Sequence, residues 1–470
     1  MSSQEIGKKQ LEVIAYVKNY LKKCKESKVD VANSSFCYFA HWAYVPGAAV
    51  LRLKLKGISY ILSFIKNILF NFLGVSTLTS YIVLRNKKKF RNFKHLVISN
   101  AQKKDFKKNG SYFDPWFQTN SRKTQNTLWF LNCVDNYFPK KIDKNLLLFV
   151  EKKQGKKIAG HMGDKWIKWS KYRFKHDFLF LFKSFIATII KFKFSFKKIL
   201  HEFSVHSQFS NIISEKILFE IANGNFKSVI SPYEAQPFQN NTFAKIKEID
   251  RKIKTIGYFH TALSPITTSM INRSGSPDKL LISGWYSKKF LNKYLGWPTK
   301  KIKTIPSFRY NTKNIPHIRP GIIYLPFNFF SLKKIVIEFE NYLKMSKIDS
   351  INHMEIRNHP YADYSKKHMK LINEIKKIIL QYKNRFTEKK NVKKKSIIIG
   401  ATSTVILALE ANIDVVHICE EPVFEAYSER LWKILLVRQI SSNTFVYKLK
   451  TRQSLIKISN NSNLLTKYCD

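Results

Sequence analysis

The sequence is poor in the residues that build secreted or zinc-binding proteins. Only five of the 470 residues are cysteine, and none of them forms a CxxC pair. This argues against a disulfide framework or a zinc site and fits a reducing compartment. The N-terminus is polar and lacks the apolar core of a signal peptide. No run of about 18 uncharged apolar residues favours a membrane-spanning helix, and neither a DxD motif nor a His/Asp cluster indicates a metal site.

Acidic residues are scarce as well. The chain has 83 Lys and Arg against 32 Asp and Glu, which gives a formal net charge of +51. Because Lys, Phe, Ile and Asn are abundant together, an AT-rich coding bias is the first explanation, an anionic membrane surface the second and nucleic acid the third. Whatever its origin, this charge attracts anionic surfaces. The 44% hydrophobic and 14% aromatic content predicts a folded protein of two or three domains.

Short β-branched runs alternate with helical patterns from His95 onward. The alternation predicts parallel, helix-covered sheets, and the proline-bearing segment Asn311–Gly321 predicts a linker between two of them. We therefore expect an α/β protein with a GT-B-like arrangement, in which two Rossmann-like domains face each other across a cleft. The predicted parts are an N-terminal region of uncertain structure (1–94), a first domain (95–315), a second domain (316–440) and a tail (441–470) with a strand at Thr444–Leu449.

One segment of the first domain, Phe178–Leu200, has the pattern of a basic amphipathic helix. At about 100° per residue its five lysines fall within one arc, while Leu181, Phe185 and Ile189 lie opposite. Such a helix can lie in the headgroup region of an anionic bilayer. It can equally pack on the protein's own core with its lysines in water, and both interpretations remain open.

The second domain offers an anion site at the carboxyl ends of its predicted strands. The strand Ile397–Ile399 is followed by Thr402, Ser403 and Thr404, which open a helix. A helix N-terminus presents free N–H groups and partial positive charge to a phosphate, although one of the three hydroxyls is expected only to cap the helix. His359, after the strand Met354–Arg357, lies at the same edge and can hydrogen-bond a phosphate oxygen.

Glutamates follow the next strand of that domain. Glu421, Glu425 and Glu429 are four residues apart, so a helix through this segment would place them on one face. Glu421 or Glu425 can accept hydrogen bonds from a ribose. A solvated acidic face is the alternative, and it fits Glu429 best.

The first domain supplies candidates for base catalysis. Glu234 in SPYEAQP and His260 in GYFHTALSP each follow a predicted strand, and neighbouring parallel strands would place both on one rim. An attacking hydroxyl needs such a group to take its proton. Arg309, at the end of a later strand, can neutralise a phosphate or an acidic sugar. Ordinary structural roles are the alternative for each residue alone.

These residues belong to motifs that resemble a known family. The motifs occur in one order: YEAQPF (Tyr233–Phe238), GYFHT (Gly257–Thr261), Ile282–Tyr310, RNHP (Arg357–Pro360), GATSTVILALEA (Gly400–Ala411) and HICEEPVFEAYSE (His417–Glu429). Over about Ser228–Leu449 the chain resembles bacterial surface-carbohydrate biosynthesis proteins with GT-B glycosyltransferase architecture. The His-Pro and Ser/Thr motifs are similar to those of bacterial sialyl-, polysialyl- and Kdo transferases.

The resemblance implies an inverting, metal-independent transferase with no cofactor beyond its nucleotide-sugar co-substrate. His359, Pro360 and the Thr402–Thr404 hydroxyls would bind the donor's phosphate, of a CMP-sugar in those relatives, and Arg357 would contact a phosphate or an acidic sugar. The acceptor would be a glycan or lipid-linked sugar, met in the cytoplasm on the inner face of the membrane. Two features depart from the family: the acidic base motif before a glycine is missing, and Ala235 stands where glycine is expected.

Three other functions stay open. One is a different nucleotide-sugar enzyme of the same fold, such as a hydrolysing epimerase or a teichoic-type phosphotransferase. A second is a non-catalytic scaffold for envelope assembly. The third, a basic nucleic-acid binder, ranks lowest because the lysines accompany no recognisable nucleic-acid module, so we expect no nucleic-acid partner.

Overall fold

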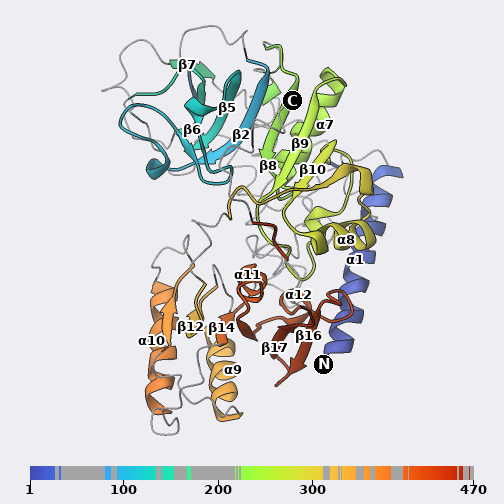
Figure 1. Ribbon diagram of the computed structural model, residues 1–470, viewed down its shortest axis with the longest axis vertical. Helices are drawn as coiled ribbons and strands as arrows, with labels where there is room; N and C mark the ends of the chain where they lie inside the picture. The colour runs from blue at the N-terminus through green and yellow to red at the C-terminus, as the bar shows by residue number, and fades with distance from the viewer. Residues whose placement is uncertain are drawn as a thin grey trace, which may run out of the picture.

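The computed structural model has two α/β lobes, drawn one above the other in Figure 1. We call the nine-stranded sheet with its helices the N-terminal lobe and the six-stranded sheet with its helices the C-terminal lobe. The expected fold class, two Rossmann-type lobes facing each other, is confirmed. The structure describes residues 1–26, 31–32, 80–85, 93–133, 139, 141–152, 167–170, 217–218, 221, 224–310, 318–326, 329, 331–345, 354–359, 366–382, 395–400, 402–451, 455–458 and 465.

The sheet of the N-terminal lobe has the strand order β11-β10-β9-β8-β2-β5-β6-β1-β7. From β11 to β6 every neighbouring pair is parallel, whereas β1 pairs antiparallel with β6 and β7. The strands are β1 (Ser80–Arg85), β2 (His95–Ala101), β5 (Thr127–Cys133), β6 (Leu146–Lys152), β7 (Ile167–Ser170), β8 (Ser228–Pro232), β9 (Lys254–Phe259), β10 (Lys279–Ile282) and β11 (Ile302–Thr304), and the helices are α7 (Pro237–Ile249) and α8 (Trp285–Leu295).

The C-terminal lobe has the strand order β13-β12-β14-β15-β17-β16. Its parallel part runs from β13 to β15, and β17 adds antiparallel to both β15 and β16. The strands are β12 (Ile322–Tyr324), β13 (Glu355–Arg357), β14 (Lys395–Ile399), β15 (Asp414–Ile418), β16 (Leu435–Gln439) and β17 (Thr444–Leu449), and the helices are α9 (Leu332–Met345), α10 (Lys366–Gln381), α11 (Thr404–Glu410) and α12 (Pro422–Glu425).

Both faces of the C-terminal sheet are buried, which explains why its central strands read as continuous apolar runs. On β14, Ile397 and Ile399 face a core formed with α9 and α10, whereas Ile398 faces the core shared with α11. Side chains alternate between faces along a strand, so an uninterrupted isoleucine run satisfies both cores. Helix α9 buries Ile335, Phe339, Tyr342 and Leu343 against this sheet.

Two of the predicted boundaries are wrong. The strand β1 at Ser80–Arg85 belongs to the sheet of the N-terminal lobe, so that lobe begins before residue 95. The strand β17 lies between β15 and β16, so the second sheet continues past residue 440 to Leu449. The strand itself was predicted correctly. The predicted helix Phe178–Leu200 and residues 311–317 of the predicted linker lie outside the described residues.

An apolar contact joins the lobes. The Trp432 ring stacks on the rings of Tyr286 and Phe290 of α8, with centroids 5.3 and 5.1 Å apart. The Tyr286 hydroxyl donates to the carbonyl of Leu431 (2.6 Å), and the Tyr427 hydroxyl donates to the carbonyl of Leu263 (3.0 Å). Because these rings lie in one continuous buried cluster, the relative placement of the two lobes is fixed by packing.

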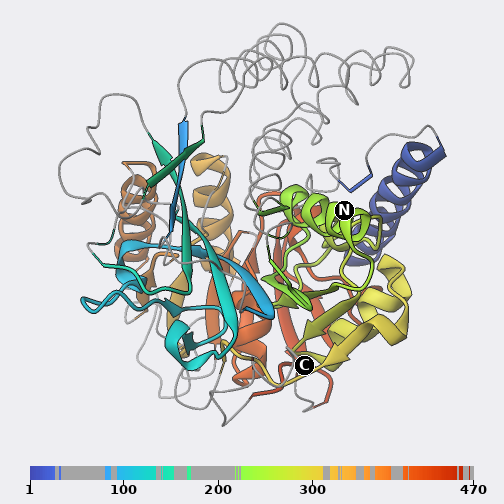
Figure 2. The same ribbon diagram turned by 90° about the horizontal axis from the view of Figure 1, so that it is seen from above.

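The N-terminal helix and the C-terminal segment strengthen this contact. Helix α1 (Ser3–Glu26), drawn in blue in Figures 1 and 2, packs against α12, and its Gln10 amide donates to the carbonyl of Ala426 in the C-terminal lobe at 2.7 Å. Near the other end of the chain, Lys457 N donates to Ser283 O at 2.5 Å, and the neighbouring backbone N–H groups bond to the Glu410 carboxylate of α11.

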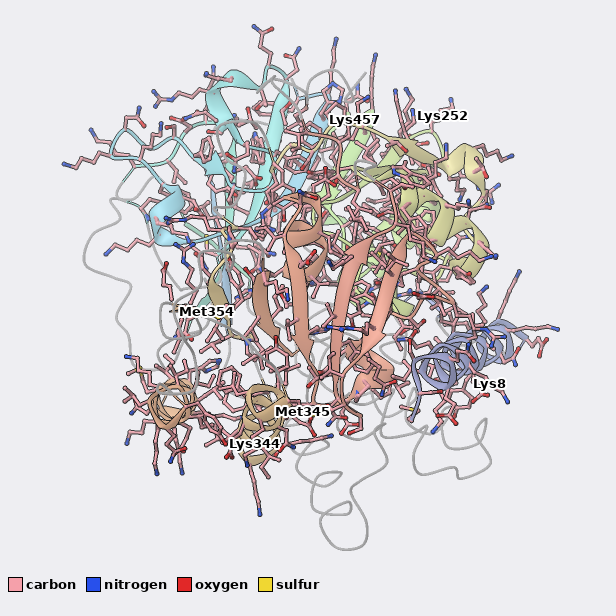
Figure 3. All side chains as sticks on the ribbon, turned by 60° about the horizontal axis from the view of Figure 1, so that its bottom comes forward. Lys8, Lys252, Lys344, Met345, Met354 and Lys457 are labelled. Atoms are coloured by element: carbon pink, nitrogen blue, oxygen red, sulfur yellow. The ribbon has the colours of Figure 1, made fainter. Side chains whose placement is uncertain are left out.

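Exposed lysines cover the molecule on many sides. Lys8 on α1, Lys252 before β9 and Lys344 on α9 are all exposed and lie on different parts of the outline in Figure 3. A charge distributed in this way matches a compositional origin better than one basic groove for nucleic acid. None of the helices in the described part of the chain combines the length and hydrophobicity needed to cross a bilayer.

Candidate active site

Strand register brings Glu234 and His260 together. Strands β8 and β9 pair so that Ser228 lies opposite Lys254 and Pro232 opposite Tyr258; continuing this register by two residues sets Glu234 opposite His260. The contact is present, with His260 Nε2 lying 3.3 Å from Glu234 Oε1. The two candidates for base catalysis therefore form a pair at the carboxyl edge of the sheet.

Burial shapes the charge of this pair. It raises the pKa of the Glu234 carboxyl, against the smaller lowering effects of the Gln236 amide and the Arg309 charge. Burial, reinforced by Arg309, also lowers the pKa of His260 well below its ordinary value. The imidazole is thus neutral near pH 7. Since an ionised carboxylate can only accept hydrogen bonds, the ring is expected to present Nε2–H to Glu234.

Backbone strain accompanies Glu234. The next residue, Ala235, has φ +56°, in the left-handed region that suits glycine. Its carbonyl accepts from the Asn240 amide (3.1 Å) and from Arg273 Nη2 (3.2 Å). This turn directs the chain from β8 into α7, and it explains why the resemblance predicts glycine at this position.

Trp116 is a site residue that the sequence did not reveal. Its ring packs on the His260 imidazole with centroids 4.1 Å apart. Asp114, which is fully buried, fixes the loop by accepting from the backbone N–H groups of Trp116 and Phe117 at 2.8 and 2.7 Å. An Asp-Pro pair disfavours helix at this point, but nothing in its spacing places the indole against His260.

Arg309 extends the site toward the C-terminal lobe. Its guanidinium carbon lies 5.1 Å from the centroid of the Trp116 ring, and Tyr258 holds the preceding turn because its hydroxyl accepts from the Phe308 N–H at 2.9 Å. The Arg309 charge also contributes, after burial, to lowering the pKa of His359 to about 4. Arg309 is therefore electrostatically coupled to candidate residues of both lobes.

The three hydroxyl residues after β14 have different roles. Thr402 Oγ1 accepts from the backbone N–H of Thr404 (3.1 Å) and lies 2.8 Å from Thr404 Oγ1. Ser403 is the N-cap residue of α11 by position, yet its side chain makes no capping bond. The expectation that one of the three only caps the helix fits Thr402, and Ser403 is left available for a ligand.

The turn before these residues is rigid. Gly400 has φ +71°, and a Cβ there would lie 2.9 Å from Pro326. Its carbonyl is held by Nε2 of the fully buried His417 at 2.7 Å. Glycine is needed both for the conformation and for the close approach.

A recess between the lobes joins the two halves of the site. Its cavity volume is about 30 Å³, which is room for about two water-sized groups. The lining residues come from both lobes and are Glu234, Phe259, Thr261, Ala262, Ser264, Thr267, Ser269 and Ser403. Glu234 and Ser403, assigned separately from the sequence, thus face one space.

His359 and Arg357 follow the strand β13. Tyr324 of β12 pairs with Arg357 of β13 and with Ile398 of β14, so His359 and Gly400 lie at matching heights on the same edge. The Arg357 guanidinium pairs with Glu355 of its own strand at 2.8 Å. A contact between Arg357 and a ligand stays a prediction. Pro360 lies outside the described residues.

The predicted glutamate face is wrong. Helix α12 ends at Glu425, and Ala426 is extended, because the chain turns there to place Tyr427 against the N-terminal lobe. Glu425 is buried and accepts from the backbone N–H of Glu420 at 2.7 Å, and Glu421 lies 3.5 Å from Lys334 Nζ. Both carboxylates therefore have structural partners, and a ribose contact by either residue remains a prediction.

Comparisons with known proteins leave the function to be argued from the site. No protein-family model matches the chain, and no curated protein matches it. Among solved structures, the chain is similar to a glycosyltransferase from Rickettsia africae ESF-5, with 11% sequence identity and a TM-score of 0.29 over 68% of this chain and 78% of that one. A similarity of this size carries no argument about function, which has to come from the site.

Proposed function

We propose that the protein is an inverting glycosyltransferase that moves a sugar from a nucleotide-sugar to the hydroxyl of a glycan or lipid-linked acceptor. The observation that supports this most is the recess, in which a partly buried carboxylate of one lobe faces a helix-opening hydroxyl of the other. The acceptor would enter against the N-terminal lobe, and the donor's phosphate would bind near Ser403, His359 and Arg309.

In the proposed reaction Glu234 is the base. The acceptor oxygen attacks the anomeric carbon as Glu234 takes its proton, the new glycosidic bond forms, and the bond to the phosphate oxygen breaks with its electron pair. Glu234 suits this role because it lines the recess and because a raised pKa makes a carboxylate a stronger base. His260 does not line the recess and acts by positioning the carboxylate.

The positive charge of Arg309 would stabilise the departing phosphate. A CMP-activated acidic sugar is the donor that the Arg309 charge and the resemblance favour, and the basic surface suits a site of action at the cytoplasmic face of a membrane. Metal independence belongs to the same proposal and is checked by assaying transfer with and without EDTA.

The test is an assay of purified protein with CMP-, UDP- and GDP-sugars, in which nucleotide release and sugar transfer are both measured. We expect transfer with inversion from one nucleotide class. In Glu234→Gln the rate of transfer should fall by roughly 100-fold or more. The matched control is Glu248→Gln on the exposed face of α7, which should retain the rate. Free sugar without transfer, or retention of configuration, would contradict the proposal and favour a hydrolysing epimerase or a retaining enzyme.

A further inference from the structure

The recess has an unusual chemical lining. Besides the apolar Phe259 and Ala262, it consists of hydroxyl side chains and one carboxylate. The hydroxyls are those of Thr261, Ser264, Thr267, Ser269 and Ser403, and the carboxylate is that of Glu234. No lysine, arginine or histidine is among these described lining residues. The described lining of this recess thus holds no cationic side chain, although the chain has 83 basic residues.

One of these hydroxyls has no hydrogen-bond partner among the residues that the structure describes. Ser269 is 1% exposed, and its Oγ is buried without a hydrogen bond to any residue that the structure describes. Ser264 and Thr267 differ, because their hydroxyl oxygens lie 3.1 Å apart and Thr267 donates to the Ser264 carbonyl. A buried hydroxyl without a partner lowers stability, which is accounted for if its partner arrives with a ligand.

Arg273 fixes the position of Ser269 relative to Glu234. Its Nη1 donates to the carbonyl of Ser269 at 2.6 Å, and its Nη2 donates to the carbonyl of Ala235 at 3.2 Å. The wall that carries the unpaired hydroxyl is thus tied to the turn that carries the proposed base. A hydroxyl held in this way can bind a group adjacent to the one that Glu234 deprotonates.

The charge of the recess selects against acids. The ionised Glu234 carboxylate repels a second carboxylate at short range in a poorly solvated site. Arg309 offsets only part of this repulsion, because it lies over the Trp116 ring, is not part of the lining, and lowers the pKa of Glu234 less than burial raises it. Hydroxyl groups of a ligand, in contrast, can both donate to Glu234 and bond to Ser269.

We propose that the recess binds one edge of an uncharged sugar, the acceptor, with Ser269 bound to a hydroxyl next to the reacting one. This inference rests on the proposed function for its account of the reacting hydroxyl, but the binding itself is independent of any donor. It makes Ser269 a specificity-determining residue and sets the acceptor apart from the acidic sugar proposed for the donor.

Binding of matched methyl glycosides tests the inference. Methyl glucoside and galactoside are compared with methyl glucuronide and galacturonide, which differ from them only by a carboxylate at C6, by saturation-transfer NMR titration of the full-length protein. We expect at least one neutral glycoside to bind about 10-fold more tightly than its uronide. Ser269→Ala should weaken that binding about 10-fold without lowering the melting temperature, whereas the exposed Ser274→Ala should change neither. Glu234→Gln should reduce the difference in affinity between the neutral glycoside and its uronide.

Equal or tighter binding of the uronide to the wild-type protein would overturn the inference, as would unchanged binding by Ser269→Ala or no binding of either neutral glycoside. The proposed function fails separately. If neutral glycosides bind but no nucleotide-sugar supports transfer, the sugar site stands without the enzyme. If transfer proceeds but favours p-nitrophenyl glucuronide over p-nitrophenyl glucoside, the enzyme stands without this acceptor class.

Discussion

Glu234 and Ser403 belong to different lobes, and both line one recess. Each stands after a parallel strand, at the edge where open α/β sheets bind ligands. A second relationship runs across the same boundary, since the Arg309 charge in the N-terminal lobe helps to lower the pKa of His359 in the C-terminal lobe. A reaction at this boundary needs both lobes, and damage to either half of the site should reduce activity.

The first prediction concerns the pH dependence of activity. A base must be unprotonated, so kcat/KM should rise with pH through the pKa of Glu234, which burial raises above the ordinary 4.5. The acid limb should therefore begin at a higher pH than for an exposed glutamate. Initial rates measured from pH 4 to 8 test this. His260→Asn replaces the ring beside Glu234 and should shift the pH at which the acid limb begins, whereas Glu234→Gln should abolish the limb. An acid limb that persists in Glu234→Gln would show that another residue is the base.

The second prediction separates two neighbouring hydroxyls. Thr402→Ala removes the oxygen that caps the Thr404 N–H and should lower the free energy of unfolding by about 1 kcal/mol. Ser403→Ala removes no capping bond, so its stability should stay within about 0.5 kcal/mol while the KM for the donor rises. Urea unfolding and initial rates on the two variants test this. The same effect of both variants on stability and KM would refute the division of roles.

Much of the fold and part of the site could be predicted because they depend on local pattern. The β-branched runs predicted where strands lie along the chain. The position of Glu234 and His260 just after two such strands was enough to predict that they pair. That inference succeeds because side chains at the ends of adjacent parallel strands share one edge whatever surrounds them. The same reasoning placed Ser403 at the corresponding edge of the second sheet.

What could not be predicted depends on contacts between distant segments. Trp116 reaches His260 only because Asp114 fixes the loop, and no spacing encodes that approach. The glutamate face failed for a related reason. Helical spacing continues past Glu425, but docking of Tyr427 and Trp432 on the N-terminal lobe ends the helix there, so tertiary contacts outweigh local propensity.

The third prediction concerns Ala235. Its φ of +56° costs an L-residue roughly 1 kcal/mol, so Ala235→Gly should be neutral or stabilise the protein by up to about 1 kcal/mol, the gain being reduced by the greater freedom of glycine in the unfolded chain. Ala411, exposed at the end of α11 with φ −76°, is the matched control, and Ala411→Gly should destabilise by roughly 0.5–1 kcal/mol. Chemical unfolding of both variants compares them; a larger loss in Ala235→Gly than in Ala411→Gly would exclude strain at this turn.

The fourth prediction concerns Asp114. Its carboxyl is fully buried, and burial raises its pKa to about 6 against the lowering effect of its hydrogen bonds. Asp114→Asn keeps one acceptor oxygen for the loop N–H groups and should fold, with Trp116 still near His260. Asp114→Ala leaves two buried donors unpaired and should cost about 2–5 kcal/mol. Activity should fall in Asp114→Ala, because the loop that holds Trp116 against His260 loses its anchor, and unchanged activity in this variant would show that Trp116 has no part in the reaction.

The last prediction follows from His417, the buried histidine that holds the Gly400 carbonyl. Burial lowers its pKa to about 4, against 6.5 in the unfolded chain. Between about pH 6.5 and pH 4, His417 is therefore protonated in the unfolded state and neutral in the folded state. The stability of the protein falls as the pH is lowered through that range. For this one group the loss approaches about 3 kcal/mol.

His417→Gln removes that titration and keeps an amide able to donate to Gly400. The variant should be less stable than the wild type at pH 7, because Tyr447 and Cys419, 3.4 and 3.5 Å from Nδ1, lose their neighbour, but its stability should fall less between pH 6.5 and 4. Urea titrations at several pH values give both slopes, and because His260 and His359 titrate in both proteins, the difference belongs to position 417. Parallel slopes would mean that the pKa of His417 is the same in the folded and the unfolded protein, and the lowering of its pKa by burial would have to be abandoned.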